Sequence, residues 1–137
     1  SSDIKLLVAS AFRSFDTQTS LKSEYKIVYG AGTANQFSAD QGYSEHQLGT
    51  AVDFTTSTAA GVFSKFQADP AYKWLKDNAY KYGFILSYPE NNFYYKFEPW
   101  HWRFVGIELA TFLHGEGKYF YGLDQREIDE YLIKLFD

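Results

Sequence analysis

Two of the three histidines in this chain lie in short motifs that also carry carboxylates. The first motif places His46 shortly before Asp53, and the second places His101 just after Glu98. Catalytic zinc is held by three protein ligands, drawn from imidazole nitrogens and carboxylate oxygens when Cys is absent, and keeps one position for water. The chain has no Cys. We therefore predict that any metal sits on His, Asp or Glu, and that His46, Asp53 and His101 supply the ligand set.

Glu98 is a candidate general base. If residues 100–104 form a strand, His101 points to one face and Trp100 and Trp102 point to the other, which leaves Glu98 at the mouth of the strand beside the metal. A carboxylate there can accept a proton from a water whose pKa the metal lowers to about 7. General-base assistance of this kind is typically worth about 10² to 10⁴ in rate.

Each motif taken alone also has an ordinary structural explanation. A histidine in a polar loop needs no metal, and a Glu-x-x-His spacing often arises by chance. Asp53 lies between Val52 and Phe54, where an unpartnered carboxylate is costly to bury, and this favours a ligand role. The two motifs together are much harder to explain by accident, so we expect a single site built from both.

Composition excludes several classes of protein. With 137 residues and 45% hydrophobic side chains, the chain is one domain, residues 1–137, long enough to bury a core. Its 13 Lys and Arg are scattered against 17 Asp and Glu, which argues against nucleic-acid binding. No apolar run reaches the roughly 20 residues that cross a bilayer, so we expect no transmembrane segment. Oligomeric state leaves no clear signal, and a monomer is favoured.

The order of elements predicts a mixed fold. Asp69-Pro70 is a helix start that Gly83 ends, and Asp124 with Glu127 is a capping pair for the last helix. Gly49 allows the chain to turn between His46 and the strand that carries Asp53. Strands are expected at 4–8, 51–54, 84–87, 93–97 and 100–104, and further helices at about 17–29, after an Asp16 cap, and 106–113. Several short strands close in sequence favour an α+β fold.

The metal motifs together resemble those of the VanY-type D-alanyl-D-alanine carboxypeptidases, zinc peptidases that act on bacterial cell-wall peptides. The matching residues are Ser44-x-His46-x-x-Gly49-x-Ala51-x-Asp53 and Glu98-Pro99-Trp100-His101-Trp102. The segment from Ser10 to Gln18 is similar to the family's Ser-Gly-Tyr-Arg-Ser segment with its following Gln. The chain departs from the family at Ala11, where Gly is common, and at Asp40-Gln41-Gly42, where Arg-Pro-Gly is more frequent.

This resemblance implies an α+β fold in which a small antiparallel sheet, flanked by helices, carries the zinc site, as in lysostaphin-type peptidases and the Hedgehog domain. It implies one Zn²⁺ on the three ligands and Glu98 as the catalytic base. Arg13 would hold the scissile carbonyl and its developing oxyanion, a task that a fixed guanidinium suits. Gln18 and Ser44 would help to position the peptide. The family's N-terminal helix is missing, so a trimmed domain is expected.

We therefore expect a zinc D,D-carboxypeptidase that removes the terminal D-Ala of peptidoglycan stem peptides outside the bacterial cytoplasm. An L,D-carboxypeptidase acting on tetrapeptide stems shares the same motifs, and a cell-wall endopeptidase is a third possibility. A non-catalytic muropeptide-binding module with structural zinc is an alternative of a different class. Glu98 and Arg13 argue against that module, because binding alone has no use for a base beside a metal.

Overall fold

Four strands form one antiparallel sheet within residues 4–29, 38–59 and 62–136, the part of the chain that the computed structural model describes. The strands are β1 (Leu7–Ser10), β2 (Ala51–Thr55), β3 (Phe84–Leu86) and β4 (His101–Phe104). Their order across the sheet is β1-β2-β4-β3, and each neighbouring pair is antiparallel. The expected α+β class with a small antiparallel sheet is confirmed.

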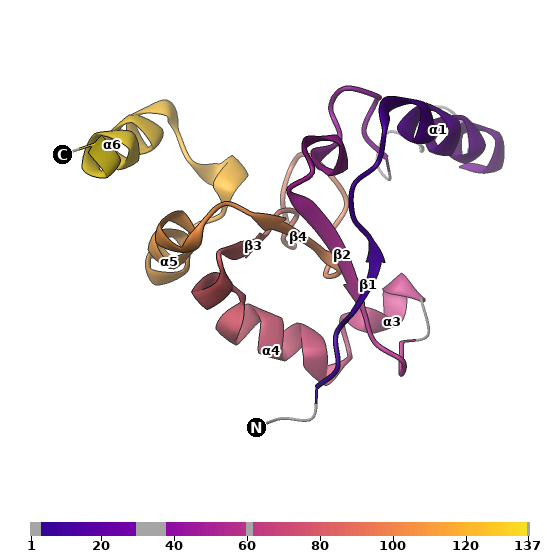
Figure 1. Ribbon diagram of the computed structural model, residues 1–137, viewed down its shortest axis with the longest axis horizontal. Coiled ribbons are helices and arrows are strands. Elements are labelled where there is room, and N and C mark those ends of the chain that lie inside the picture. Colours follow the sequence, from indigo (N-terminus) through magenta and orange to yellow (C-terminus); the bar gives the residue numbers. More distant parts are fainter. Residues whose placement is uncertain (1–3, 30–37, 60–61, 137) are drawn as a thin grey trace.

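Helices flank this sheet on both sides (Figure 1). They are α1 (Phe15–Tyr29), α3 (Phe63–Phe66), α4 (Pro70–Asn78), α5 (Ile107–Glu116) and α6 (Gln125–Phe136), with 3₁₀ turns η1 (Glu45–Leu48), η2 (Ala79–Tyr82) and η3 (Phe120–Gly122). Figure 1 shows α3 and α4 below the sheet, and α1 with η1 above it. None of the described helices is long and apolar enough to cross a membrane.

The helix caps read from the sequence are present. The Asp69 carboxylate accepts a hydrogen bond from the Ala71 amide at 2.9 Å, and Pro70 opens α4. This helix continues through η2 and stops at Gly83, whose φ of 83° is favourable only for glycine. Before α6, Asp124 and Glu127 each accept from the other's backbone amide at 2.9 Å. This reciprocal pair is the predicted capping box.

The strand predicted at 93–97 is wrong. The side-chain oxygen of Asn92 accepts hydrogen bonds from the amides of Tyr94 and Tyr95, both at 2.9 Å, and this turns the chain where a strand would have to extend. The aromatic residues there have high β-propensity, but a local turn outweighs it.

Two boundaries at the N-terminal end also differ from expectation. The first strand begins at Leu7 instead of residue 4, and it is an exposed edge strand, with Val8 63% exposed. In the described sheet β1 is hydrogen-bonded to one strand only, β2, so it forms one edge of the sheet. Helix α1 begins at Phe15 because the Ser14 hydroxyl accepts from the Thr17 amide at 3.2 Å, which puts Asp16 in the first turn instead of at the cap.

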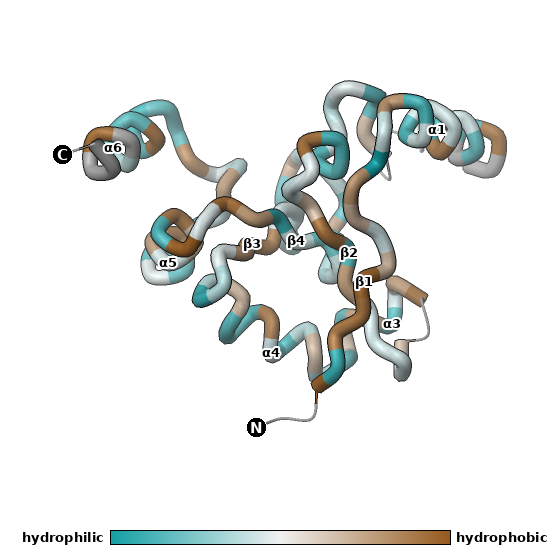
Figure 2. The backbone as a smooth tube through the Cα atoms, viewed as in Figure 1, coloured by the Kyte–Doolittle hydropathy of each residue, from teal (hydrophilic) through white to brown (hydrophobic). Residues whose placement is uncertain are grey.

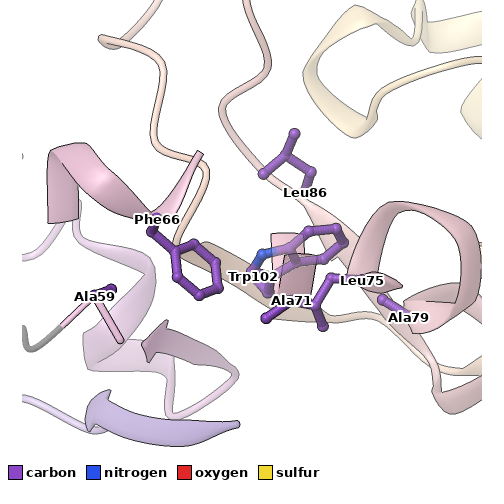
Figure 3. Close-up of a cluster of buried hydrophobic side chains, with 7 residues drawn as sticks. All are labelled: Ala59, Phe66, Ala71, Leu75, Ala79, Leu86 and Trp102. Carbon is purple, nitrogen blue, oxygen red and sulfur yellow. The ribbon is translucent and has the colours of Figure 1, made fainter. Parts of the chain in front are cut away.

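The main core packs between the sheet and the helices below it. Apolar stretches of the tube run along β1, β2 and β3 (Figure 2). Figure 3 shows the Trp102 indole at the centre of a buried cluster, with Phe66 on one side and Leu75 on the other. Burying a large apolar side chain is worth about 1.5–3 kcal/mol. Because neighbouring residues of a strand face opposite ways, burying Trp102 against the helices turns His101 to the other face.

Candidate metal and catalytic site

Three buried side chains, from two strands and the 3₁₀ turn η1, meet on the face of the sheet opposite the main core. Asp53 of β2 is directly paired with His101 of β4, so their side chains lie on the same face, and His46 approaches from η1. The two oxygens of Asp53 each contact one histidine: Oδ1 is 3.0 Å from Nδ1 of His101, and Oδ2 is 3.3 Å from Nε2 of His46. One ligand atom from each residue lies within 4.8 Å of the others.

His46 is oriented by its backbone surroundings. Its Nδ1 is 2.6 Å from the carbonyl oxygen of Ala11, a contact in which Nδ1 carries the proton and Nε2 is left to face Asp53. Directly after η1, Gly49 adopts a φ of 72° and donates its amide to the His46 carbonyl at 3.3 Å. The turn predicted at Gly49 is therefore confirmed.

His101 is oriented by its ring nitrogens and by a stacked ring. Its Nε2 is 2.9 Å from the carboxylate of Glu45, which leaves Nδ1 on the side of Asp53. The Tyr88 ring stacks on the imidazole with centroids 4.8 Å apart. Each histidine thus presents one ring nitrogen to Asp53, while its other ring nitrogen is hydrogen-bonded to an acceptor outside the cluster. Metal-binding histidines are usually held in this way. Two imidazoles and one carboxylate so arranged fit a zinc ion.

The charges of these groups depend strongly on one another. Burial opposes ionisation of Asp53, but hydrogen bonds from His101 and His46 outweigh it and hold the pKa of Asp53 well below its usual range. Burial likewise disfavours the charged form of His101, yet its contacts with Asp53 and Glu45 raise its pKa above the usual value. These shifts favour an ionised Asp53 and a protonated His101 in the metal-free site, an ion pair that a bound metal cation would replace.

Glu98 lies beside this cluster without belonging to it. Its Oε2 is 3.8 Å from Nδ1 of His101, too far for a direct hydrogen bond, and its side chain is 15% exposed. Burial raises the pKa of Glu98 to about 7, and the charge of nearby Asp53 adds to the shift. A carboxylate with a pKa near neutrality is suited to accept and return a proton.

Arg13 contacts the same cluster from the segment between β1 and α1. Its Nη2 donates to Oδ2 of Asp53 at 3.0 Å, its Nε to the Ser10 hydroxyl at 3.1 Å, and its Nη1 to Oε1 of Gln18 at 3.3 Å. The pairing of β1 with β2 shifts between Val8 and Ser10, which brings Ser10 opposite Asp53. This irregularity at the sheet edge places the Arg13 side chain over the site.

Gln18 and Ser44 lie at the wall of the site. Gln18 is only 1% exposed, and its amide donates to the Ser38 hydroxyl at 3.0 Å and to the Ala39 carbonyl at 2.9 Å. Its contact with Arg13 therefore fixes the guanidinium. Ser44 is 7% exposed and directly precedes η1. The contact of either residue with a peptide stays a prediction.

The site opens into a cavity of about 230 Å³. The wall includes all seven site residues named from the sequence: Arg13, Gln18, Ser44, His46, Asp53, Glu98 and His101. Aromatic side chains complete it, among them Tyr88, Tyr95 and Trp100. A larger cavity of about 330 Å³, lined by Trp102, Leu75 and Leu113, contains none of those seven residues. The smaller cavity is therefore where the predicted chemistry would take place.

Sequence reasoning missed Glu45, which is 3% exposed and contacts His101. It also missed Ser87, Arg103 and Tyr121, which all donate hydrogen bonds to Glu45. The position of Glu45 beside His46 in the first motif was the one signal that could have identified it. Its partners come from distant parts of the chain, so no local pattern reveals them.

Comparison with known proteins decides the family. The VanY family, D-alanyl-D-alanine carboxypeptidase, matches residues 1–107. The chain belongs to the VanY family. Within it, the D-alanyl-D-alanine carboxypeptidase of Enterococcus faecalis (strain ATCC 700802 / V583) is 37% identical over 123 residues, which cover 81% of this chain and 44% of the relative. The chain thus spans less than half the length of this curated VanY relative.

Solved structures of bacterial carboxypeptidases share the fold. The LdcB LD-carboxypeptidase matches with a TM-score of 0.77 and 33% identity, over 88% of this chain and 60% of that chain. The VanY D,D-pentapeptidase from a VanB-type resistance cassette, an E175A mutant in complex with Zn(II), matches with a TM-score of 0.72 and 34% identity, over 85% of this chain and 69% of that chain. The solved structures that match this chain thus include both D,D- and L,D-carboxypeptidases.

Proposed function

We propose that this chain is a zinc-dependent D,D-carboxypeptidase domain that hydrolyses the terminal D-Ala of peptidoglycan stem peptides. The observation that carries the proposal is that one cavity is lined by a buried His-Asp-His set, a carboxylate with a near-neutral pKa and a fixed guanidinium. We infer an extracytoplasmic, monomeric protein, because its substrate is the cell wall and nothing in the sequence favours an oligomer.

His46, Asp53 and His101 are the residues that would hold the zinc ion. Bound there, zinc supplies a Lewis acid that polarises a carbonyl and lowers the pKa of water. The Zn(II) complex of the VanY D,D-pentapeptidase, which is 34% identical to this chain over the matched region, supports zinc as the metal.

Glu98 is the proposed general base. It takes a proton from the water that attacks the scissile carbonyl, and it returns that proton to the amine of the departing D-Ala as the C–N bond breaks. In the metal-free protein, burial raises the pKa of Glu98 to about 7, so this carboxyl group can both accept and return a proton near neutral pH. The 3.8 Å gap to His101 keeps Glu98 outside the ligand set and close to its edge.

Arg13 is the proposed electrostatic partner of the carbonyl. Its guanidinium is held by Ser10, Gln18 and Asp53, and its side chain is still 20% exposed at the cavity. A guanidinium fixed before the substrate arrives can donate to the carbonyl oxygen as negative charge develops there. Gln18 would act through Arg13, and Ser44 would contact the peptide at the cavity wall.

An L,D-carboxypeptidase acting on tetrapeptide stems is the second candidate. One observation favours it: the LdcB LD-carboxypeptidase superposes with a TM-score of 0.77, compared with 0.72 for the VanY D,D-pentapeptidase. The bond broken is again the one that releases a terminal D-Ala. An endopeptidase would cut inside the peptide, and a muropeptide-binding module would cut nothing.

Mass spectrometry of digested muropeptides tests these functions. Stems ending in D-Ala-D-Ala and stems ending in a single D-Ala are each incubated with zinc-loaded protein and with chelator-treated protein. We expect zinc-dependent loss of one alanine from the pentapeptide. Loss from the tetrapeptide alone would establish the L,D activity, and internal cleavage would establish an endopeptidase. Binding of muropeptides without any cleavage would overturn the enzymatic proposal.

A further inference from the structure

Glu45 accepts four hydrogen bonds from side chains around the site. It is not among the described residues that line the cavity. Its Oε2 accepts from Nε2 of His101 at 2.9 Å and from the Ser87 hydroxyl at 2.7 Å. Its Oε1 accepts from Nη1 of Arg103 at 3.1 Å and from the Tyr121 hydroxyl at 2.6 Å. A buried carboxylate with four donors, two on each oxygen, is held in a single orientation.

This carboxylate controls which nitrogen of His101 faces Asp53. A neutral imidazole has one N–H and one lone pair, and the partner of the N–H decides where the lone pair points. Glu45 accepts from Nε2–H, so Nδ1 is the nitrogen on the side of Asp53, whose Oδ1 lies 3.0 Å away, and the lone pair of Nδ1 would face a metal ion bound there. Without this acceptor, the ring could exchange its two nitrogens and direct the wrong one at the ligand set.

We propose that Glu45 is the positioning residue of the metal centre, and that Tyr121 connects the C-terminal part of the chain to that centre by completing the hydrogen bonds of Glu45. The inference rests on the proposed zinc site, but not on which peptide is cleaved. Glu45 acts through His101 and is not among the residues that line the substrate cavity in the described part of the chain.

Tyr121 lies beyond residue 107, where the match to the VanY family model ends. Its ring stacks with Tyr88, which in turn stacks on His101. Its carbonyl accepts from the Tyr94 hydroxyl at 3.0 Å, and the neighbouring Phe120 ring lies 4.7 Å from the guanidinium of Arg103. Turn η3 is thus packed onto the Arg103 guanidinium, which donates to Glu45, and onto the Tyr88 ring, which stacks on His101.

The proposal is tested by zinc affinity, measured by competition with a chelator of known affinity. We expect Glu45→Gln to weaken zinc binding about 10- to 100-fold, the usual effect of removing a partner of a metal-binding histidine. Tyr121→Phe removes one of the four hydrogen bonds and should weaken zinc binding by a smaller factor. Glu90→Gln is the matched control, because Glu90 is exposed and contacts Gln67 instead of the site.

A second readout distinguishes positioning from general loss of structure. In zinc-loaded protein, NMR should show a hydrogen-bonded Nε2–H proton on His101, protected from exchange in the wild type and lost or rapidly exchanging in Glu45→Gln. If Glu45→Gln fails to fold, Ser87→Ala and Tyr121→Phe keep the carboxylate and should weaken zinc binding with unchanged circular dichroism. Zinc affinity within twofold of the wild type in all the folded variants would overturn the proposal.

The failure of this inference can be told apart from the failure of the proposed function. A wild-type protein that binds no zinc overturns both. In a second case the wild-type protein binds zinc, and Glu45→Gln weakens zinc binding as described, but the wild-type protein cleaves no stem peptide. This result supports the positioning role and overturns only the substrate assignment.

Discussion

The Asp53 carboxylate bridges two histidines that are far apart in sequence, with Oδ1 3.0 Å from His101 and Oδ2 3.3 Å from His46. It also accepts from Arg13 at 3.0 Å, so one side chain connects the proposed ligand set to the proposed electrostatic partner. Strand pairing is the cause, because Asp53 faces His101 in the register of β2 and β4.

Replacing Asp53 by Asn should therefore abolish tight zinc binding. The amide is neutral, so it neither compensates the cation nor orients both imidazoles, and we expect an affinity at least about 100-fold lower. Isothermal titration of chelator-treated protein measures the change. Asp77→Asn is the control, since Asp77 is exposed and pairs with Lys73 on α4. Unchanged affinity in Asp53→Asn would remove Asp53 from the ligand set.

Replacing Glu98 by Ala should remove catalysis and leave the metal bound. We expect the rate of alanine release to fall by about 10² to 10⁴, the usual contribution of a general base. Zinc content, measured by elemental analysis, should stay at one ion per chain, because Glu98 lies outside the ligand set. A variant that keeps the full rate would show that another group transfers the proton.

Replacing Arg13 by Lys should lower the rate without loss of zinc. A single ammonium cannot reproduce the fork that reaches Ser10, Gln18 and Asp53 together. We expect kcat to fall by about 10² to 10³, as for removal of one donor to a developing oxyanion. Arg126→Lys, on the exposed face of α6, should retain the wild-type rate. A large rise in KM with kcat unchanged would assign Arg13 to substrate binding alone.

The stability of the metal-free protein should depend on pH through Glu98. Its pKa rises from 4.5 to about 7 on folding, mainly because it is buried, so the folded chain holds this proton more tightly than the unfolded chain. The resulting stability is fully present below pH 4.5 and is lost as the pH rises through 7, with a magnitude of about 3 kcal/mol. Urea unfolding of wild-type and Glu98→Gln proteins at several pH values isolates this contribution. Parallel pH profiles for the two proteins would contradict it.

Gly83, which ends η2, should not tolerate a side chain. Its φ is +83°, and an added Cβ would lie 2.6 Å from the Phe104 ring and 3.0 Å from the Gly106 backbone. We expect Gly83→Ala to destabilise the fold by about 2 kcal/mol or more. Gly115→Ala is a stringent control, because Gly115 lies within α5 with open space around it. We expect this substitution to raise the free energy of unfolding by about 0.5–1 kcal/mol. Thermal unfolding that gives both variants the same stability would refute this explanation.

Short-range patterns predicted those parts of the molecule that short-range forces determine. The caps at Asp69 and Asp124 and the turn at Gly49 depend on side chains and backbone dihedrals within a few residues. The juxtaposition of His101 and Asp53 was also foreseeable, since both lie in strands with buried apolar neighbours. Local propensity failed at residues 93–97, where the side chain of Asn92 turns the backbone.

The arrangement around Glu45 could not be predicted because it depends on tertiary contacts. Tyr121 reaches Glu45 only after η3 has packed against the sheet, and nothing near either residue in sequence indicates that approach. Gln18 was predicted as a peptide contact, but its burial beneath the site depends on how segment 38–39 lies across α1. Its predicted effect on the peptide would then come through Arg13.

The backbone of the segment between β1 and α1 is fastened to η1 by two hydrogen bonds that involve no metal. The Arg13 amide donates to the His46 carbonyl at 3.2 Å, and the His46 ring reaches back to Ala11 at 2.6 Å. These bonds already hold both the proposed electrostatic partner and one proposed ligand in place. The conformational entropy of this half of the site is therefore lost when the chain folds, so an arriving ion meets a preorganised frame.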